Sequence, residues 1–236
     1  MVVSSVASGT LLDDPKKKTP RKATSSRQTL GTQARAITTR NAILQAAIEV
    51  FSKRGFDGGR IELVSTIAGT HDRMIYYYFG SKENLFVEVL KTVYQRMNDA
   101  EAALQIDIDD PVGALTTVIH FTWQYYLDHP EFMRLLNTEN LHQGQHLKSS
   151  NRMSDLLSPG VGMIDRALSA GADKGLFRQG LRARDLYIAI AALGYFYLSN
   201  RHTLSAFLGE DLLAKPAIKH WREFITDMVL RSVAPR

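Results

Sequence analysis

The segment RMIYYYFGSK, residues 73–82, places three consecutive tyrosines in a chain that is only 9% aromatic. Successive residues of a helix point about 100° apart, so the phenols of Tyr76–Tyr78 cannot all face one core. Ile75 and Phe79 lie one turn apart and can anchor such a helix to its domain. We therefore expect some of the phenols to face a partner outside that core.

The sequence around this segment predicts three consecutive helices. From Ile37 onward apolar residues recur at helical spacing, and Thr38 or Thr39 can cap the helix start. The sequence Lys53-Arg54-Gly55 predicts the end of this helix at residue 55. Gly69 and Gly80 predict the ends of the next two helices. The expected helices therefore cover residues 37–55, 61–69 and 71–80. A tight glycine-bearing turn between the second and third is typical of a helix-turn-helix.

A helix-turn-helix indicates which side chains would read DNA. Its second helix lies in the major groove, and the N-terminal residues of that helix meet base edges. Arg73 and His71 suit guanine edges or phosphates, Asp72 can accept from cytosine, and Met74 can pack on a thymine methyl. Tyrosine hydroxyls reach phosphates, and Lys82 beside a helix N-terminus can clamp one. The candidate DNA-binding residues are Arg60, His71, Asp72, Arg73, Met74, Tyr76, Tyr77, Tyr78 and Lys82.

The three phenols are expected to differ in their surroundings. Tyr76 is predicted to lie at the boundary of the domain, with its ring partly packed and its hydroxyl toward phosphate. Tyr77 and Tyr78 are predicted to project toward the DNA backbone. Which of the three is packed depends on the exact phase of the helix.

The net charge of +5 is unevenly distributed along the 236 residues. Residues 1–40 carry a charge of +6 and the rest of the chain sums to −1. Nucleic-acid binding must therefore use a local site together with this basic segment. Residues 1–36 are rich in Ser, Thr, Lys and Arg, so we expect a disordered basic tail. This tail is either a solvated extension or an arm that contacts phosphates or a minor groove.

Several classes of protein are excluded by composition and motifs. The chain has no cysteine, which excludes disulfides, thiolate zinc sites and a cysteine nucleophile. No run of about 18 apolar residues exists to span a membrane, and the N-terminus lacks the apolar core of a secretory signal. Asp13-Asp14-Pro15 disfavours a transit peptide. We expect a cytoplasmic, nucleoid-associated protein without a membrane partner.

Enzymatic and metal-binding signals fail on inspection. Glu139, His142 and His146 could share a helical face, but Gly144 interrupts the segment and no second Glu-x-x-His copy exists. The chain has no phosphate-binding loop, no GxSxG motif and no paired acid and base. We therefore expect no catalytic residue, no metal and no cofactor.

The remaining sequence is helical throughout. A long helix is expected from Ser81 to about Gln105, and prolines at first-turn positions open helices at residues 111, 130 and 159. No period-2 alternation occurs, so we predict an all-α fold of about nine helices. Residues 37–83 form the expected DNA-binding domain, and residues 84–236 the expected ligand-binding and dimerisation domain.

Residues 37–86 contain a series of short motifs in a specific order and spacing: Val50-Phe51, Gly55-Phe56, Val64-Ser65, Ala68-Gly69, Tyr76–Phe79, Ser81-Lys82 and Leu85. In this order and spacing the segment resembles the DNA-binding domain of the tetracycline-repressor (TetR) family of bacterial regulators. Two departures concern the base-reading face: Thr70-His71 stands where Val-Ser is usual, and Arg73-Met74 replaces a small residue and threonine. The resemblance therefore implies binding to double-stranded operator DNA without implying the operator sequence.

The resemblance also implies a homodimer in which two C-terminal helices of each subunit form a four-helix bundle. The segments 186–198 and 218–229 are apolar enough to need a partner. The alternative is that both belong to a monomeric core. The candidate dimer residues are Leu186, Ile190, Leu193, Tyr197, Ile218, Trp221, Ile225 and Met228.

Candidate ligand-binding residues mix aromatic and polar side chains, as small-molecule sites do. The alternative for each is ordinary core packing. Segment 129–140 is also similar to the ligand domains of regulators of pyrimidine and nicotine catabolism. The candidates are His120, Trp123, Gln124, Phe132, Met133, Asn137, Asn140 and Met163.

Together these features predict a homodimeric transcriptional regulator without enzymatic activity. We expect a repressor that leaves its operator when a small aromatic or N-heterocyclic effector binds. The effector would shift the helix that begins at Ser81 and so change the distance between the two recognition helices. The alternative is a nucleoid or division factor on the same scaffold, without small-molecule control.

Overall fold

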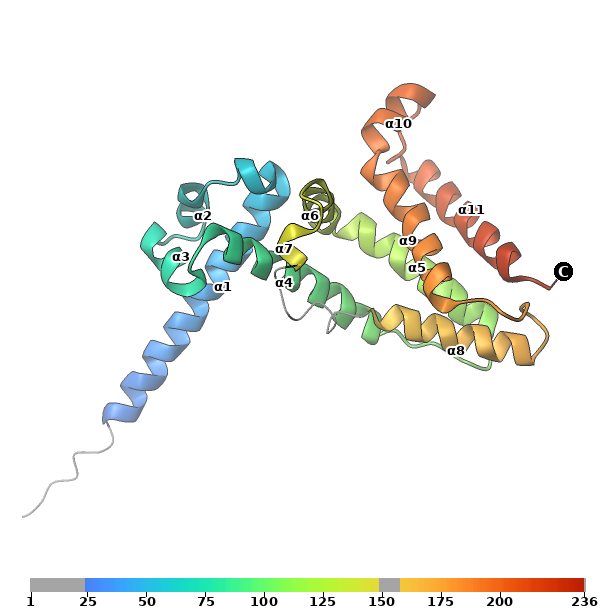
Figure 1. Ribbon diagram of the computed structural model, residues 1–236, viewed down its shortest axis with the longest axis horizontal. Coiled ribbons are helices and arrows are strands. Elements are labelled where there is room, and N and C mark those ends of the chain that lie inside the picture. Colours follow the sequence, from blue (N-terminus) through green and yellow to red (C-terminus); the bar gives the residue numbers. More distant parts are fainter. Residues whose placement is uncertain (1–23, 149–157, 236) are drawn as a thin grey trace, which may run out of the picture. The chain divides into compact units, whose positions relative to one another are not determined.

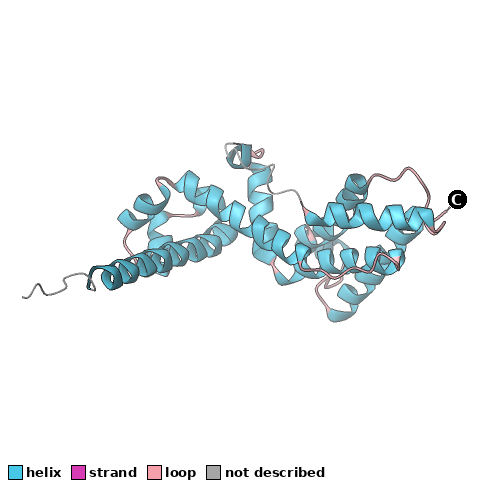
Figure 2. Ribbon diagram, turned by 90° about the horizontal axis from the view of Figure 1, so that it is seen from below, coloured by secondary structure: helices cyan, strands magenta, loops and turns pink. Residues whose placement is uncertain are grey.

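The structure is a computed structural model that describes residues 24–148 and 158–235. Over these ranges it contains helices and loops and no strand (Figure 2). Eleven helices replace the nine expected, because short helices after α6 and α9 were not predicted from the sequence. The helices are α1 (Thr24–Gly58), α2 (Ile61–Ile67), α3 (Asp72–Phe79), α4 (Lys82–Ala102), α5 (Pro111–Asp128), α6 (Pro130–Leu141), α7 (Gln145–Lys148), α8 (Pro159–Asp173), α9 (Ala183–Ser199), α10 (Arg201–Leu208) and α11 (Lys215–Val233).

The chain divides into two compact units, residues 1–38 and residues 39–236. The described part of the first unit is helical from Thr24, so the prediction of disorder was wrong for residues 24–36. These residues include helix formers such as Ala, Arg and Gln, and they contain no proline. Thr38 does not cap the helix, since its hydroxyl donates to the carbonyl of Ala34 at 3.0 Å. The rest of the predicted tail, residues 1–23, lies outside the described residues.

A glycine-rich segment ends α1 as the sequence predicts, although one turn later than expected. Gly55 has φ 68°, a left-handed conformation that favours glycine, and the helix resumes as far as Gly58. A Cβ at Gly59 would lie 2.4 Å from the ring of Phe51. The chain can therefore turn from α1 into α2 because Gly59 has no side chain.

Helices α1 to α4 of the second unit enclose a common core. Ile43, Phe51, Ile75 and Phe86 have no exposed surface, and such full burial of large apolar side chains supplies most of the stabilising free energy. Arg40 of α1 adds a link, since its guanidinium lies 4.9 Å from the Phe79 ring centroid and 3.0 Å from the Glu88 carboxylate. This core fixes α3 relative to α1 and α4.

Helices α5, α8, α9 and α11 pack side by side in the remainder of the chain (Figure 1). Prolines open α5 and α8, and a side chain caps each start: Asp110 accepts from the Gly113 amide and Ser158 from the Gly160 amide. The long helix α4 spans Lys82 to Ala102, somewhat shorter than expected. Within the described ranges, no helix is long and apolar enough to cross a membrane.

Candidate nucleic-acid interface and tyrosine cluster

Helix α3 presents one face to the core and another to solvent. Ile75 is fully buried and Phe79 nearly so, which confirms that these two residues anchor the helix. Tyr77 is 76% exposed and Tyr76 is 51% exposed. The Tyr76 and Tyr77 phenols therefore project from the domain into solvent.

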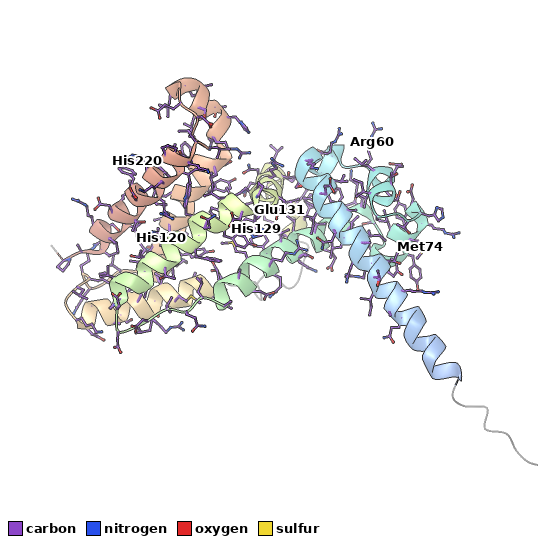
Figure 3. All side chains as sticks on the ribbon, turned by 180° about the vertical axis from the view of Figure 1, so that it is seen from behind. Arg60, Met74, His120, His129, Glu131 and His220 are labelled. Atoms are coloured by element: carbon purple, nitrogen blue, oxygen red, sulfur yellow. The ribbon has the colours of Figure 1, made fainter. Side chains whose placement is uncertain are left out.

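Three cationic or polar side chains accompany these phenols. Arg60 is the N-cap residue of α2, His71 is the N-cap residue of α3, and Arg73 lies in the first turn of α3. All three are exposed, and within the described part of the chain their side chains make no hydrogen bond or ion pair. Figure 3 labels Arg60 on this domain. We define Arg60, His71, Arg73, Tyr76 and Tyr77 as the recognition face.

Three other predicted DNA contacts have partners within the fold. Asp72 accepts a hydrogen bond from the Ser65 hydroxyl and so ties α3 to α2, which leaves it poorly placed to read cytosine. Met74, labelled in Figure 3, and Tyr78 are half-buried against the core. Tyr78 also packs edge-on against Tyr77, with 5.0 Å between ring centroids. Tyr78, predicted to project, is thus the packed phenol of the three, because its position lies closer to the phase of Ile75.

Lys82 is engaged at the end of α1. Its ammonium lies 3.4 Å from the Asp57 carbonyl oxygen and 4.7 Å from the Phe56 ring centroid. The ammonium of Lys82 is thus shared between a carbonyl oxygen and an aromatic ring of the same chain.

A second group of side chains lies among the packed helices and consists of Tyr94 of α4, Tyr126 of α5, and Tyr187 and Tyr195 of α9. We call these four residues the tyrosine cluster. Tyr94 and Tyr126 both lie close enough to Tyr187 and Tyr195 that an ionised phenol at either of those positions would raise the pKa of Tyr94 and of Tyr126. In the described part of the chain, the hydroxyls of Tyr94 and Tyr126 have no hydrogen-bond partner.

Burial controls the protonation of these phenols. It raises the pKa of Tyr94 to about 12, with smaller contributions from Tyr187 and Glu139. It raises the pKa of Tyr126 further, since that side chain is only 5% exposed. Burial is also the main cause of the raised pKa of Tyr187. The phenols are therefore neutral near pH 7, and each can both donate and accept a hydrogen bond.

Polar side chains adjoin the tyrosine cluster. Asn137 of α6 donates to the Ser199 hydroxyl at 3.1 Å and accepts from the Tyr195 hydroxyl. Glu101, which is 1% exposed, accepts from the Ser158 hydroxyl at 2.5 Å, and the Tyr187 hydroxyl lies 3.5 Å from it. These bonds link α4, α6, α8 and α9 around the cluster.

Trp123 of α5 contributes a buried donor next to the cluster. Its side chain is 1% exposed, and its indole nitrogen has no hydrogen-bond partner. A Cβ at Gly194 would lie 3.1 Å from the Tyr126 ring and 3.7 Å from the Trp123 ring. The glycine thus lets both rings approach α9 closely, and an unsatisfied N–H remains in the interior.

Two family models match this sequence and together cover most of the described chain. The model described as "Bacterial regulatory proteins, tetR family" matches residues 43–89, and "Tetracyclin repressor-like, C-terminal domain" matches residues 111–229. The chain belongs to the TetR family. As a member, it is a DNA-binding transcriptional regulator and not an enzyme.

Relatives of known name support this membership. The HTH-type transcriptional repressor NicS of Pseudomonas putida is 52% identical over 195 residues, which span 83% of this chain and 92% of NicS. The HTH-type transcriptional regulator RutR of Escherichia coli is 28% identical over 212 residues, which span 89% of this chain and 97% of RutR. A crystal structure of the Streptomyces coelicolor regulator SCO4942 shares the fold, with a TM-score of 0.62 and 21% identity over 84% of this chain and 99% of that one.

In this TetR-family protein, the predicted ligand residues separate into three groups. Trp123 and Asn137 lie at the tyrosine cluster, and Phe132 packs against Tyr94 with 5.4 Å between ring centroids. Met133 and Met163 are buried apolar residues of the core. The remaining three predictions place their side chains away from the cluster.

His120, Gln124 and Asn140 are therefore corrections to the sequence-based ligand site. His120 contacts the Thr226 hydroxyl of α11 at 3.2 Å, and Gln124 is exposed and donates to Asp128. Asn140 is also exposed. Burial, and secondarily Arg222, lowers the pKa of His120. His120 faces α11 and Gln124 faces solvent, although both share a helical face with the buried Trp123, and Asn140 is an exposed residue of α6.

The sequence analysis missed the tyrosine cluster. A signal was present: Tyr94 and Glu101 are seven residues apart, and Tyr187 and Tyr195 are eight apart, so each pair shares a helical face. Such spacing shows a polar stripe on an otherwise apolar helix. It does not show that stripes on separate helices converge.

The predicted dimer residues also require correction. Leu186, Ile190, Tyr197 and Ile225 are buried in the core of their own chain, so they are not available to a second copy. Leu193, Ile218 and Trp221 are partly buried against that core, and the Trp221 indole donates to the Leu193 carbonyl at 3.3 Å. Of the predicted set only Met228 is exposed, at 38%. The strongest apolar stripe of each helix faces inward.

The residues considered and rejected as a metal site lie close together in the structure. The Glu139 carboxylate and His146 imidazole form a buried pair, 2.7 Å apart, and the His142 ring lies 5.3 Å from that of His146. Among the described residues, no group of three or more His, Asp or Glu side chains is arranged to hold a metal ion.

Proposed function

We propose that this regulator is a repressor that binds its operator as a homodimer and is released by a small molecule bound at the tyrosine cluster. One observation carries the effector site: the Trp123 indole N–H is buried without a protein partner, and beside it the Tyr94 and Tyr126 hydroxyls make no hydrogen bond to the described residues. Buried polar groups in native proteins are almost always satisfied, so a buried unpaired N–H next to two unpaired hydroxyls supports a bound partner. The name of the relative NicS supports repression as the direction of control.

The chemistry of the cluster defines the class of effector. Aromatic rings on several helices favour a flat ring, and neutral phenols together with an indole N–H favour hydrogen-bond acceptors on its edge. Asn137 adds an amide that can both donate and accept. A small heteroaromatic compound bearing carbonyl or ring-nitrogen acceptors meets these requirements. This agrees with the aromatic or N-heterocyclic effector expected from the sequence.

The homodimer would use the outward faces of α9 and α11. On α9, Ile188 is 58% exposed and Phe196 61%, with exposed Ala192 between them at helical spacing. On α11, His220, labelled in Figure 3, lies on the same face as Phe224 and Met228, which are 45% and 38% exposed. Adjacent apolar stripes of this kind are typical of a self-complementary interface.

The recognition face would contact operator DNA in the manner of a helix-turn-helix. Arg73 and His71, in the first turn and at the N-cap of α3, are placed for base edges. Arg60, Tyr76 and Tyr77 would contact phosphates, which fix register on the duplex. Lys82 would add charge near the backbone while it stays bound to the end of α1.

Release would occur through α4. This helix carries Tyr94 of the cluster and Glu101 beside it, and it follows α3 after only two residues, Gly80 and Ser81. Half-sites lie about 34–36 Å apart, so a shift of a few ångströms between the two α3 helices would lower operator affinity. The effector can cause this only if it binds the shifted arrangement more tightly.

The test is a gel shift on DNA from upstream of the gene, titrated with a panel of small heteroaromatic acids, amides and pyrimidine-like compounds. We expect at least one compound to release the DNA, and Tyr126→Phe to require a markedly higher concentration. Tyr125→Phe is a matched control, since Tyr125 is also buried on α5 but stacks on His129, with 4.1 Å between ring centroids. If no compound releases the DNA, the protein is a regulator without small-molecule control.

The dimer requires a separate experiment. Phe224→Asp places a charge in the proposed interface, so sedimentation should show monomers and operator affinity should fall by more than about 100-fold, as expected for a two-half-site reader. Leu208→Asp is the control, since Leu208 is 61% exposed but lies on α10. A Phe224→Asp protein that remains dimeric would contradict the assigned face.

A further inference from the structure

A buried histidine of α7 lies against the DNA-binding domain. His146 is 5% exposed, and its ring packs on Phe56 of α1 and Phe86 of α4, with centroid distances of 4.5 and 4.8 Å. Phe56 and Phe86 also pack on each other at 5.1 Å. An imidazole from residues 84–236, which we call the effector domain, is thus part of the aromatic core that joins α1 to α4.

Glu139 of α6 holds this histidine in place. One carboxylate oxygen accepts from the backbone amides of His146 and Leu147, at 3.0 and 2.9 Å. The other carboxylate oxygen lies 2.7 Å from Nδ1 of His146. Because Glu139 is only 2% exposed, the three contacts leave little freedom for α7 relative to α6.

A second histidine reinforces the same junction. His142, which follows α6, lies edge-on to Phe56 with 5.6 Å between ring centroids. Its Nε2 is 3.6 Å from the Asp57 carboxylate at the end of α1. The Phe56 ring thus contacts two histidines of the effector domain as well as the Lys82 ammonium.

We propose that Glu139 and His146 form a clasp that positions the helix-turn-helix for operator binding, in parallel with the covalent connection through α4. Asn137 lies two residues before Glu139 on α6, so one short helix connects the tyrosine cluster to the clasp. The clasp fixes the end of α1 and the start of α4, which between them carry α2 and α3. Loosening it widens the range of α3 orientations in the dimer and weakens operator binding.

This inference rests on DNA binding by the family and does not require an effector. Its test therefore uses the full-length protein without any added small molecule. If no candidate effector releases the DNA, the proposal of the clasp is unaffected. If the clasp variants bind the operator normally, the proposed effector site is equally unaffected.

Glu139→Gln isolates the role of the pair from simple packing. The glutamine carbonyl oxygen can still accept from the two backbone amides, and the side-chain NH2 replaces the carboxylate oxygen that faces Nδ1 of His146. The His146 imidazole must then have an unprotonated Nδ1. The substitution therefore changes the charge of residue 139 and the position of the proton on the His146 ring, while the shape of the side chain at position 139 is kept. Packing around Phe56 and Phe86 needs no adjustment.

The matched control is Glu131→Gln. Glu131, labelled in Figure 3 with His129, lies on the same helix and also pairs with a histidine, His129 Nδ1, at 3.2 Å, but both of these side chains are partly exposed. We expect Glu139→Gln to weaken operator binding about tenfold in fluorescence anisotropy, the size of a typical coupling contact, and Glu131→Gln to leave it unchanged. His142→Gln should act in the same direction with a smaller effect.

A double-mutant cycle separates positioning from stability. If the clasp acts through Phe56, then Glu139→Gln costs little further operator affinity once Phe56→Leu is present. Melting temperature and dimer content are measured for each variant. The proposal is overturned if operator affinity is unchanged in Glu139→Gln, if the two effects simply add, or if affinity falls only in proportion to the folded fraction. Where Glu139→Gln folds poorly, the same cycle with His142→Gln decides the matter.

Discussion

The recognition face and the tyrosine cluster use the same side chain, tyrosine, in opposite surroundings. Tyr76 and Tyr77 are exposed and come from one helix, next to cations without protein partners. Tyr94 and Tyr126 lie among packed helices and meet only in the tertiary structure. In the proposed function, the exposed phenols would contact DNA, a large charged ligand that approaches from solvent. The enclosed phenols would contact a small neutral effector that must be desolvated.

The two regions also differ in how much their polar groups contribute to folding. On the recognition face, stability comes from the residues beneath it, such as Ile75, and the polar residues are free to serve DNA. Next to the cluster, the Trp123 indole N–H is buried without a partner, which costs free energy until a ligand satisfies it. Substitutions should therefore separate the two regions clearly.

The largest expected effect is on the support of the recognition face. Ile75→Ala removes a fully buried side chain and leaves a cavity, so unfolding free energy should fall by about 2–5 kcal/mol in denaturant titrations. Tyr77→Ala on the same helix should change stability very little, because Tyr77 is 76% exposed. Similar losses for both would mean that α3 is not anchored through Ile75.

The next effect is on DNA reading. Arg73→Ala should cost about 1–3 kcal/mol of operator binding and relax base preference at one position. Lys82→Ala should weaken all DNA sequences alike, and by less, since its ammonium is shared with the Asp57 carbonyl and the Phe56 ring. Binding to a set of operator variants at several salt concentrations distinguishes them. Identical profiles for the two variants would refute the division between base and phosphate contacts.

A smaller effect is expected in the tyrosine cluster. The raised pKa of Tyr94 means that the folded protein keeps this proton longer than the unfolded chain does. The associated stability is present below pH 10 and is lost as pH rises toward about 12, the pKa in the folded state. Tyr94→Phe should therefore lose less stability than the wild type over this interval. Near pH 7 the two should be nearly equal, because the hydroxyl has no partner to lose.

The smallest effect concerns His120, labelled in Figure 3 on α5. Its lowered pKa means that the unfolded chain binds a proton more readily than the folded protein. Stability should fall as pH drops through the ordinary value of 6.5 toward the lower folded value. His120→Asn should flatten this part of the stability profile, measured by thermal unfolding between pH 7.5 and 5, values chosen to bracket that interval. An unchanged profile would show that His120 does not titrate differently on folding.

Local sequence was sufficient to predict the DNA-binding half. Prolines, glycines and capping residues mark where helices begin and end, and the phase of α3 places Ile75 and Phe79 inside and Tyr77 outside. Local reasoning there misplaced Tyr78, and it did not reveal the side chains that have partners on a neighbouring helix. Asp72 bonds Ser65 of α2, and Lys82 meets the end of α1.

The side chains around the tyrosine cluster were harder to predict as a group because they are distant in sequence. Aromatic and polar composition singled out Trp123, Phe132 and Asn137, which lie at the cluster, but the same composition also singled out His120, Gln124 and Asn140, which face elsewhere. The dimer face shows the same limit. An apolar stripe such as Leu186 and Ile190 indicates burial without indicating whether the partner is the same chain or a second copy.

The sequence by itself determined that the chain is all-α, where most helices start and stop, and that a helix-turn-helix lies near its N-terminal end. These features depend on interactions between residues a few positions apart. The tertiary structure decided that four tyrosines meet, that α9 and α11 leave Phe196 and Phe224 outside, and that Glu139 and His146 reach Phe56. The physical reason is that helical periodicity fixes which side chains share a face, while only packing determines what each face meets.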